Sequence, residues 1–232
     1  MGKKKKSVLR FWIEALLLLA LAGTGGWLWW QTRHWAPPRG TFPSQGLVTG
    51  ESDGVVDVSA LRTARVDFVY LEASSGASGR DAVFGRNLAA LADTGIRHGA
   101  VHAYDPCVPA ERQAANFVTI VPRDPELLPP AIALAKPASA CNDPVVEAAL
   151  ESELTTFINQ VEGHAGQPVV LKVSEEFETA YGIAARIERN LWLEKNWVQP
   201  DYAGRPWVLW TANSALANPA NGEPMRWVVL QP

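Results

Sequence analysis

The sequence predicts an α/β protein, an irregular TIM-like (β/α) barrel preceded by one N-terminal transmembrane helix. Two observations predict this fold. A basic start is followed by a long apolar run, and beyond it short β-branched or aromatic segments alternate with amphipathic ones. Such alternation is typical of βα units around a parallel sheet or barrel. The length of 232 residues, with 47% hydrophobic and 19% charged residues, suits one packed barrel domain.

The N-terminal region predicts a membrane anchor in three parts. Residues 1–10 are a basic tail, residues 11–30 are apolar apart from one glutamate, and residues 31–45 are a linker rich in Pro, Gly and Ser. About twenty apolar residues suffice for a helix to cross a bilayer. The positive-inside rule then places the tail in the cytoplasm. We therefore expect a single-pass protein of the bacterial inner membrane, with residues 46–232 forming a periplasmic domain.

A cleaved signal peptide is the alternative interpretation of this region. Ala20 to Ala22 before Gly23 fit a small-residue cleavage site after an apolar stretch, and cleavage there would secrete the protein. Against this, the tryptophan-rich segment 27–30 prolongs the apolar run and places aromatic residues where the outer interface would fall. We favour the uncleaved anchor.

Charge and cysteine content exclude several classes of protein. The formal net charge is −3, and the domain beyond the basic tail is more acidic still, so we expect no nucleic-acid partner. Two cysteines, Cys107 and Cys141, are too few for a disulfide scaffold or an ordinary zinc site, and we expect no metal and no cofactor. In an oxidising periplasm the two thiols can pair; two unrelated buried thiols are the alternative.

The expected strands of the domain are rich in β-branched and aromatic residues and are bounded by turn-forming residues. They lie at residues 66–74, 96–104, 127–137, 168–174, 190–194, 206–211 and 226–231.

The expected helices show apolar residues at helical spacing. Residues 80–95 form one, with Gly95 as its stop, and a second runs from near Pro109 through Phe117. A third starts with Asp143 as N-cap and Pro144 at the first helical position, and it ends at Gly163 or Gly166.

Side chains at the carboxyl ends of barrel strands converge on one mouth, where chemistry is expected. In this sequence those positions are rich in aromatic residues and poor in paired acids. They are Glu72, His102, Tyr104, Asp105, Ala133, Ala135, Lys172, Glu194, Trp210 and Trp227.

Several motifs resemble one known family over about residues 46–230. GLVTGESDGVVDVSAL lies along a Gly-Ile-Asp-Val-Ser opening, and VDFVYLEASSG is similar to a strand that ends Lys-Ala-Thr-Glu-Gly. DAVFGRN, GAVHAYDP and LPPAIALAK match further family stretches, the last being the catalytic strand Leu-Pro-Pro-Val-Leu-Asp-Val-Glu. The domain thus resembles glycoside hydrolase family 25, the Chalaropsis-type lysozymes that cut peptidoglycan between N-acetylmuramic acid and N-acetylglucosamine.

The resemblance also shows where this sequence departs from the family. The family's acidic positions fall on Val48, Ala133, Ala135 and Arg226, and none of these is a carboxylate. Glycoside hydrolysis requires a proton donor and a second carboxyl group beside the bond that is cut. The resemblance therefore implies a pseudoenzyme that binds peptidoglycan glycan strands without hydrolysing them.

Two other functions remain open at this stage. A divergent N-acetylmuramidase would use relocated acids, for which Glu72 and Asp105 are the candidates. Their ordinary roles would be an ion pair of Glu72 with Lys136 or Lys172 and a turn cap by Asp105. The second alternative is a protein-interaction module of the cell envelope.

The alignment suggests glycan-binding residues and a covalent link at the mouth. His102, Tyr104, Trp192 and Trp210 are the candidates for glycan contact, although a buried structural role is the ordinary one for each. Cys107 and Cys141 follow the third and fourth strands of the alignment, which would bring the two thiols together as a disulfide. The sequence does not specify an oligomeric state.

Overall fold

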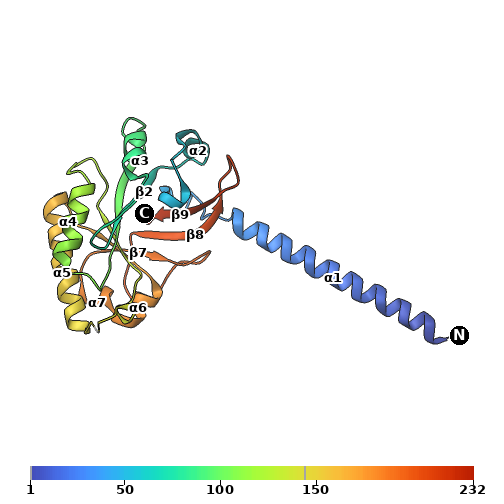
Figure 1. The fold of residues 1–232 in the computed structure, drawn as a ribbon. Helices are drawn as coiled ribbons and strands as arrows, with labels where there is room; N and C mark the ends of the chain where they lie inside the picture. The colour runs from blue at the N-terminus through green and yellow to red at the C-terminus, as the bar shows by residue number, and fades with distance from the viewer. Residues whose placement is uncertain (1, 144) are drawn as a thin grey trace. The chain divides into compact units, whose positions relative to one another are not determined.

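The computed structural model describes residues 2–143 and 145–232, and these divide into two compact units, one ending at Trp35 and one beginning at Ala36. The first unit is helix α1, Gly2–His34 (Figure 1). Its segment Arg10–His34 is long and apolar enough to cross a membrane, as judged by length and composition. The second unit contains the remaining helices and the strands.

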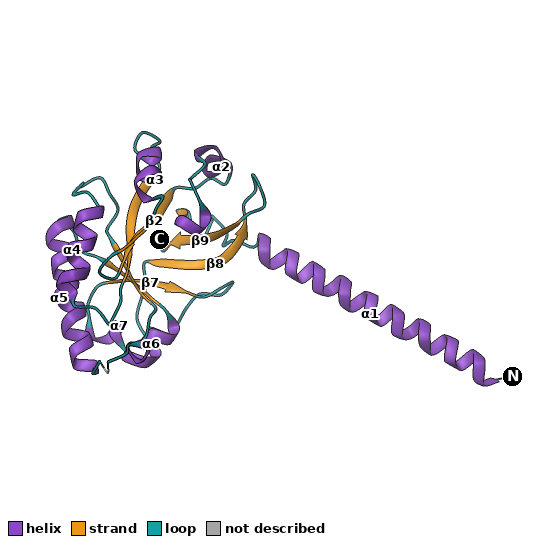
Figure 2. Cartoon of the chain, in the orientation of Figure 1, coloured by secondary structure: helices purple, strands orange, loops and turns teal. Residues whose placement is uncertain are grey.

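The second unit is a closed β-barrel with helices packed on part of its outer surface (Figure 2). Its strands are β1 Gln45–Thr49, β2 Phe68–Ser75, β3 Gly79–Arg80, β4 Arg97–Ala103, β5 Ala131–Leu134, β6 Val170–Val173, β7 Asn190–Glu194, β8 Leu209–Ala217 and β9 Pro224–Leu230. In the described residues the barrel order is β1-β9-β8-β7-β6-β5-β4-β2, and the pairing of β1 with β2 closes it. The short β3 forms an antiparallel extension of β2 outside this ring.

One strand departs from the uniform parallel arrangement of a TIM barrel. β9 is antiparallel to both of its neighbours, β8 and β1, whereas the other pairs in the ring are parallel. A tight connection through Asn218 and Gly222 joins β8 to β9 and leaves no room for a crossover helix. The prediction of an irregular α/β barrel is thus confirmed in outline. The parallel arrangement expected for a TIM barrel extends only as far as β8.

The helices of this unit lie in the connections between β1 and β7, and in the described residues no helix follows β7. They are α2 Val58–Thr63, α3 Phe84–Leu91, α4 Ala110–Ile120, α5 Glu147–Ala165, α6 Glu175–Tyr181 and α7 Ile183–Arg186, with 3-10 turns η1 Glu51–Asp53 and η2 Ala138–Ala140. Helices α4 and α5 pack against each other. Phe117 and Phe157 from these two helices are buried beneath them.

Helix α5 begins later than the sequence pattern predicts. The residue before its first turn is Val146, whose extended backbone (φ −75°, ψ 150°) precedes Glu147. Asp143 therefore does not act as the N-cap, and Pro144 lies outside the described residues. The predicted stop is found, because Gly166 adopts the left-handed conformation that ends the helix.

The segment expected as a linker, residues 31–45, is divided differently in the structure. Residues 31–34 continue α1, and Gln45 already belongs to β1. Between them, Phe42 is buried against the rings of Trp207 and Trp210, and the Gln45 side-chain amide donates to Pro37 O and Phe42 O. The chain before β1 is therefore packed onto the barrel.

Side chains that point inward fill the middle of the barrel. Tyr70 and Trp192 meet there with ring centroids 4.9 Å apart, and the indole N–H of Trp192 donates to Thr211 Oγ1 at 2.8 Å. Val48, Val101 and other small apolar residues surround them. This core separates two open ends, the mouth at the carboxyl ends of the parallel strands and the base at their amino ends.

Candidate functional site

The barrel mouth contains a hollow of about 400 Å³, which we call the mouth cavity. Its volume is within the range of small-molecule binding sites. The residues that line it come from the mouth ends of β1, β2, β4, β5 and β6 and from the adjacent loops. They are Val48, Glu51, Ser52, Glu72, Ser74, Ser75, Gly79, Arg80, Asp81, Val101, Ala103, Ala133 and Lys172.

The positions to which the family resemblance assigns acids lie at or near this cavity. Val48 and Ala133 line it, and Val48 is paired in register with Arg226 of β9, so their side chains share the inner face. Ala135 follows β5 and is exposed. Val48 and Ala133 thus present a branched alkyl group and a methyl group to the cavity, and Arg226 lies beside Val48 on the neighbouring strand.

Arg226 is the centre of an ion-pair cluster at the mouth. Its guanidinium bonds to Glu72 through Nη1 and to Asp53 Oδ2 through Nη2 at 2.7 Å. Burial acts to lower the pKa of Arg226, but the hydrogen bonds and charges of Glu72 and Asp53 raise it above its ordinary value. Arg226 is therefore a permanent cation, and Glu72 is its partner rather than the partner of Lys136 or Lys172.

Asp81, which the sequence did not single out, lies close to Glu72. A Cβ placed on Gly50 would be 2.2 Å from Glu72 Oε2 and 2.9 Å from Asp81 Oδ2, so the two carboxylates flank this glycine. Asp81 also accepts backbone N–H bonds from Glu51 at 2.5 Å and Val83 at 2.9 Å. Only the tertiary structure brings these acids together, because they lie on β2 and in the loop after β3.

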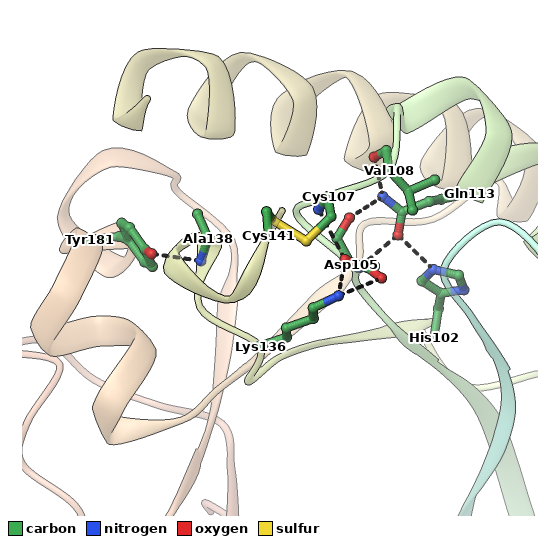
Figure 3. Close-up of polar contacts among 9 residues, drawn as sticks. All are labelled: His102, Asp105, Cys107, Val108, Gln113, Lys136, Ala138, Cys141 and Tyr181. Atoms are coloured by element: carbon green, nitrogen blue, oxygen red, sulfur yellow. Dashed lines mark hydrogen bonds and ion pairs between the residues drawn. A yellow bond between two sulfur atoms is a disulfide. The ribbon is translucent and has the colours of Figure 1, made fainter. Parts of the chain in front are cut away.

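Asp105 occupies a different place from Glu72. Lys136 Nζ donates to both of its carboxylate oxygens, at 2.7 and 2.8 Å, and the N–H of Cys107 donates to Oδ1 at 2.9 Å (Figure 3). Among the described residues it is absent from the lining of the mouth cavity. The structure therefore does not bring Glu72 and Asp105 into one catalytic pair, and Asp105 stabilises a turn, as its ordinary role implies.

A disulfide joins the two loops beside this ion pair. Cys107, after β4, is bonded to Cys141, after β5, with a Cα–Cα distance of 5.2 Å. Figure 3 shows the bridge next to Asp105 and Lys136, so one covalent and one ionic link hold the same two loops.

Lys172 of β6 contributes a cation to the cavity lining. Its Nζ lies 2.8 Å from Glu194 Oε1 and 5.5 Å from the ring centroid of Trp192. The ammonium group thus lies over an indole face and is paired with a carboxylate, an arrangement that orients it at the mouth.

His102 and Tyr104 are not available for glycan contact in this structure. His102 is 0% exposed, shares hydrogen bonds with Ser74 Oγ (2.8 Å) and Gln113 Oε1 (3.4 Å), and packs against Phe117 and Phe157. Burial lowers the pKa of His102 to about 4, so the imidazole is neutral. Tyr104 is 3% exposed, and burial raises the pKa of its phenol. Both side chains point toward the helices because they alternate with inward-facing residues on β4.

The two tryptophan candidates are also buried. Trp192 is inside the barrel, and the N–H of Trp210 donates to Lys195 O at 2.7 Å while its ring packs on Phe42. The exposed indole of this region is Trp197, 47% accessible in the loop after β7 and held at a positive φ of 68°. Sequence periodicity cannot identify it because it lies outside any regular element.

A barrel with its polar cavity at the mouth is the architecture of many glycoside-cleaving enzymes. The chain matches the model of "Glycosyl hydrolases family 25" over residues 50–217 and belongs to that family. No curated protein matches the chain. Within the described residues, no group of three His, Cys, Asp or Glu is arranged to hold a metal ion.

Solved structures support the same fold. A family 25 glycosyl hydrolase from Bacillus anthracis is 24% identical, with a TM-score of 0.77 over 85% of this chain and 92% of that one. A bacterial lysozyme from Streptomyces coelicolor is 19% identical, with a TM-score of 0.70 over 81% and 91%. A lysozyme from Aspergillus fumigatus is 16% identical, with a TM-score of 0.67 over 82% and 94%.

Proposed function

We propose that this protein binds the glycan strands of peptidoglycan through its family 25 barrel and does not cleave them. The observation that supports this proposal best is the charge arrangement at the mouth. Ala133 offers no functional group, and Glu72 is bound by Arg226. Family membership, together with solved relatives described as lysozymes, supports a cell-wall glycan as the ligand.

Hydrolysis of a glycoside requires two carboxyl groups in different roles. One delivers a proton to the leaving oxygen, and the other acts as base or nucleophile or stabilises the positive charge that develops at the sugar. The Arg226 guanidinium holds both Glu72 and Asp53 in hydrogen-bonded ion pairs, so these carboxylates face a protein cation rather than a substrate atom. The mouth therefore favours binding over cleavage.

The mouth cavity has the chemistry needed to hold a polar sugar. Ser74, Ser75, Arg80 and Lys172 contribute hydroxyl and cationic donors to its lining, and such groups satisfy sugar hydroxyl, acetamido and carboxylate oxygens. Trp197 presents an exposed ring that a pyranose could stack on.

The test uses the full-length chain in lipid nanodiscs and purified peptidoglycan sacculi. We expect the protein to sediment with the sacculi and to release no reducing muramic ends above the buffer control. Failure to sediment would contradict glycan binding and would favour the protein-interaction module.

The active alternative, a divergent N-acetylmuramidase, is favoured by the proximity of Glu72 and Asp81 around Gly50. If reducing ends are released, Glu72→Gln and Asp81→Asn should each abolish the release. Glu126→Gln, an exposed glutamate after α4, is the matched control and should leave the release unchanged. That result would replace the binding proposal with a hydrolytic one.

We also propose that α1 anchors the protein in the bacterial inner membrane as a single-pass span, with the barrel in the periplasm. The apolar length of Arg10–His34 and the basic residues before it support this topology. The disulfide supports an oxidising compartment for the barrel.

A further inference from the structure

The base of the barrel, opposite the mouth, contains a second pocket of about 350 Å³, which we call the base pocket. It lies where the parallel strands begin, and this end of a TIM barrel ordinarily serves stability rather than binding. The pocket is lined by Ser44, Asp67, Phe68, Tyr70, Arg97, Leu128, Pro129, Val170, Asn190, Val208, Leu209 and Leu230.

The inner wall of the base pocket is apolar. Phe68 and Tyr70 form an edge-to-face pair with ring centroids 6.3 Å apart. The Tyr70 hydroxyl donates to Pro129 O at 3.0 Å, so this polar atom is already satisfied. Val170 and Leu209 complete the wall. Such a surface accepts an aliphatic chain and offers few hydrogen bonds to a polar ligand.

Gly46 and Gly99 leave room for the aromatic rings of this wall because they have no side chain. A Cβ on Gly46 would lie 2.2 Å from Phe68 O and 2.5 Å from the Phe68 ring. A Cβ on Gly99 would lie 2.9 Å from Leu128 Cβ and 3.0 Å from Tyr70 Cε1. The rings therefore pack directly on the neighbouring backbones.

The rim of the base pocket provides a cation. Asp67 is engaged by Arg39 at 2.7 Å and by the N–H of Gln45 at 2.9 Å. Arg97 is exposed, and among the described residues it has no ion-pair partner. Arg97 is paired in register with Phe68 across β2 and β4 and lines the pocket, which places it beside the apolar wall.

We propose that the base pocket binds the aliphatic chain of an anionic amphiphile, with Arg97 beside its acidic head group. An apolar wall and an accessible cation at the rim are complementary to a chain that ends in a carboxylate or phosphate. Each methylene buried in such a pocket strengthens binding about fourfold. A free fatty acid and an anionic phospholipid share this chemistry.

The experiment is photo-labelling of the full chain in phosphatidylcholine nanodiscs. One arm uses soluble dodecanoate carrying a diazirine near its methyl end, and a second uses phosphatidylglycerol with the diazirine in an acyl chain. Labelled peptides are identified by mass spectrometry. We expect labels on the segments around Phe68 to Tyr70 and Val208 to Leu209. Labelling in the first arm alone identifies a free fatty acid, and labelling in the second identifies a membrane lipid.

Variants that reduce the pocket volume or remove the charge of Arg97 are compared with the wild-type protein for the extent of labelling. Val208→Trp and the milder Val170→Leu reduce the accessible volume and should each lower pocket labelling, the former at least about tenfold. Arg97→Gln should weaken labelling by the dodecanoate probe but not by the matching dodecanol probe, and Arg62→Gln on α2 is the control. The circular dichroism spectrum of each variant verifies folding.

Labelling confined to α1, or pocket labelling that both filled variants retain, would overturn the proposal. The proposal would also be overturned if the dodecanoate probe labelled the Arg97→Gln variant as strongly as it labels the wild-type protein. None of these outcomes depends on whether the mouth binds or cleaves glycan.

Discussion

At the barrel mouth, three acidic side chains are each paired with a cation. Glu72 is bound by Arg226, Glu194 by Lys172, and Asp105 by Lys136. A carboxylate in such a pair is positioned by a cation rather than left to act on a substrate. Arg226 is shared with Asp53, so the ion pairs link several strands and loops around the cavity.

A double-mutant cycle measures the coupling energy between Arg226 and Glu72. Arg226→Ala leaves Glu72 and Asp53 close together without their shared cation, so it should destabilise the fold more than Glu72→Gln does. Because the Arg226 and Glu72 side chains are 28% and 41% exposed, we expect a coupling energy of only about 1 kcal/mol. Urea unfolding of both single variants and the double variant measures it. A coupling energy of zero would show that the pair is incidental.

His102 predicts a defined pH dependence of stability. Its pKa is about 4 in the folded protein because of burial and about 6.5 when unfolded. Below pH 6.5 the unfolded chain takes up a proton that the folded chain does not. The contribution of neutral His102 to the free energy of unfolding is therefore complete above about pH 6.5 and is lost as the pH falls toward 4. We expect a loss of about 2 kcal/mol between pH 7 and pH 5.

Comparison with His102→Gln isolates this effect. The variant should be less stable at pH 7 but should lack most of the additional loss at pH 5, as measured by urea denaturation at both values. Equal losses in the two proteins would assign the pH dependence to other groups.

At the scale of elements, the loops after β4 and β5 are the most firmly connected part of the mouth. The disulfide closes a separation of 34 residues, and the Lys136–Asp105 pair lies beside it. The short β5, Ala131–Leu134, carries no carboxylate, and a disulfide and an ion pair connect the loop after it to the loop after β4. These two links fix the position of one loop relative to the other.

Removal of the disulfide should destabilise the barrel by about 2–4 kcal/mol, because the unfolded chain regains the entropy of a long loop. The Cys107→Ala/Cys141→Ala variant should show this loss in denaturant unfolding under oxidising conditions. Wild-type protein should show a similar loss with reductant present, whereas the double variant should not respond to reductant. A wild-type protein that is insensitive to reductant although its thiols are shown to be free would contradict this expectation.

At the scale of the whole molecule, a membrane-length helix and a family 25 barrel occur in one chain. An anchored barrel would be confined to the layer of the envelope within reach of its anchor. This confinement suits a protein that holds a glycan in place better than one that must travel along it.

The anchor proposal predicts that the mature protein keeps its N-terminal segment. After expression in a Gram-negative bacterium, the chain should stay in the membrane fraction during carbonate extraction, and intact mass should include residues before Gly23. Protease added to spheroplasts should digest the barrel, with a cytoplasmic protein as the control. A soluble product that begins at Gly23 would establish signal cleavage instead.

Much of the architecture was predictable from local patterns. Strand positions such as 96–104 and 190–194 follow from β-branched and aromatic runs, and Gly166 was recognisable as a helix stop. The late start of α5 was not predictable. Asp143 and Pro144 suggested a helix start, but Val146 has an extended backbone and the helix begins at Glu147. The antiparallel β9 was also missed, since strand direction depends on how the barrel closes and not on composition.

The sequence by itself determined the class of the protein, because apolar periodicity, the basic start and the family motifs are all written in neighbouring residues. The family resemblance also predicts that Ala133 and Ala135 stand at acidic positions of the family. Only the tertiary structure decided which charges meet, placing Arg226 between Glu72 and Asp53 and burying His102 and Trp192. Ion pairs and burial depend on distances between strands that are remote in the chain, and these distances exist only once the barrel has closed.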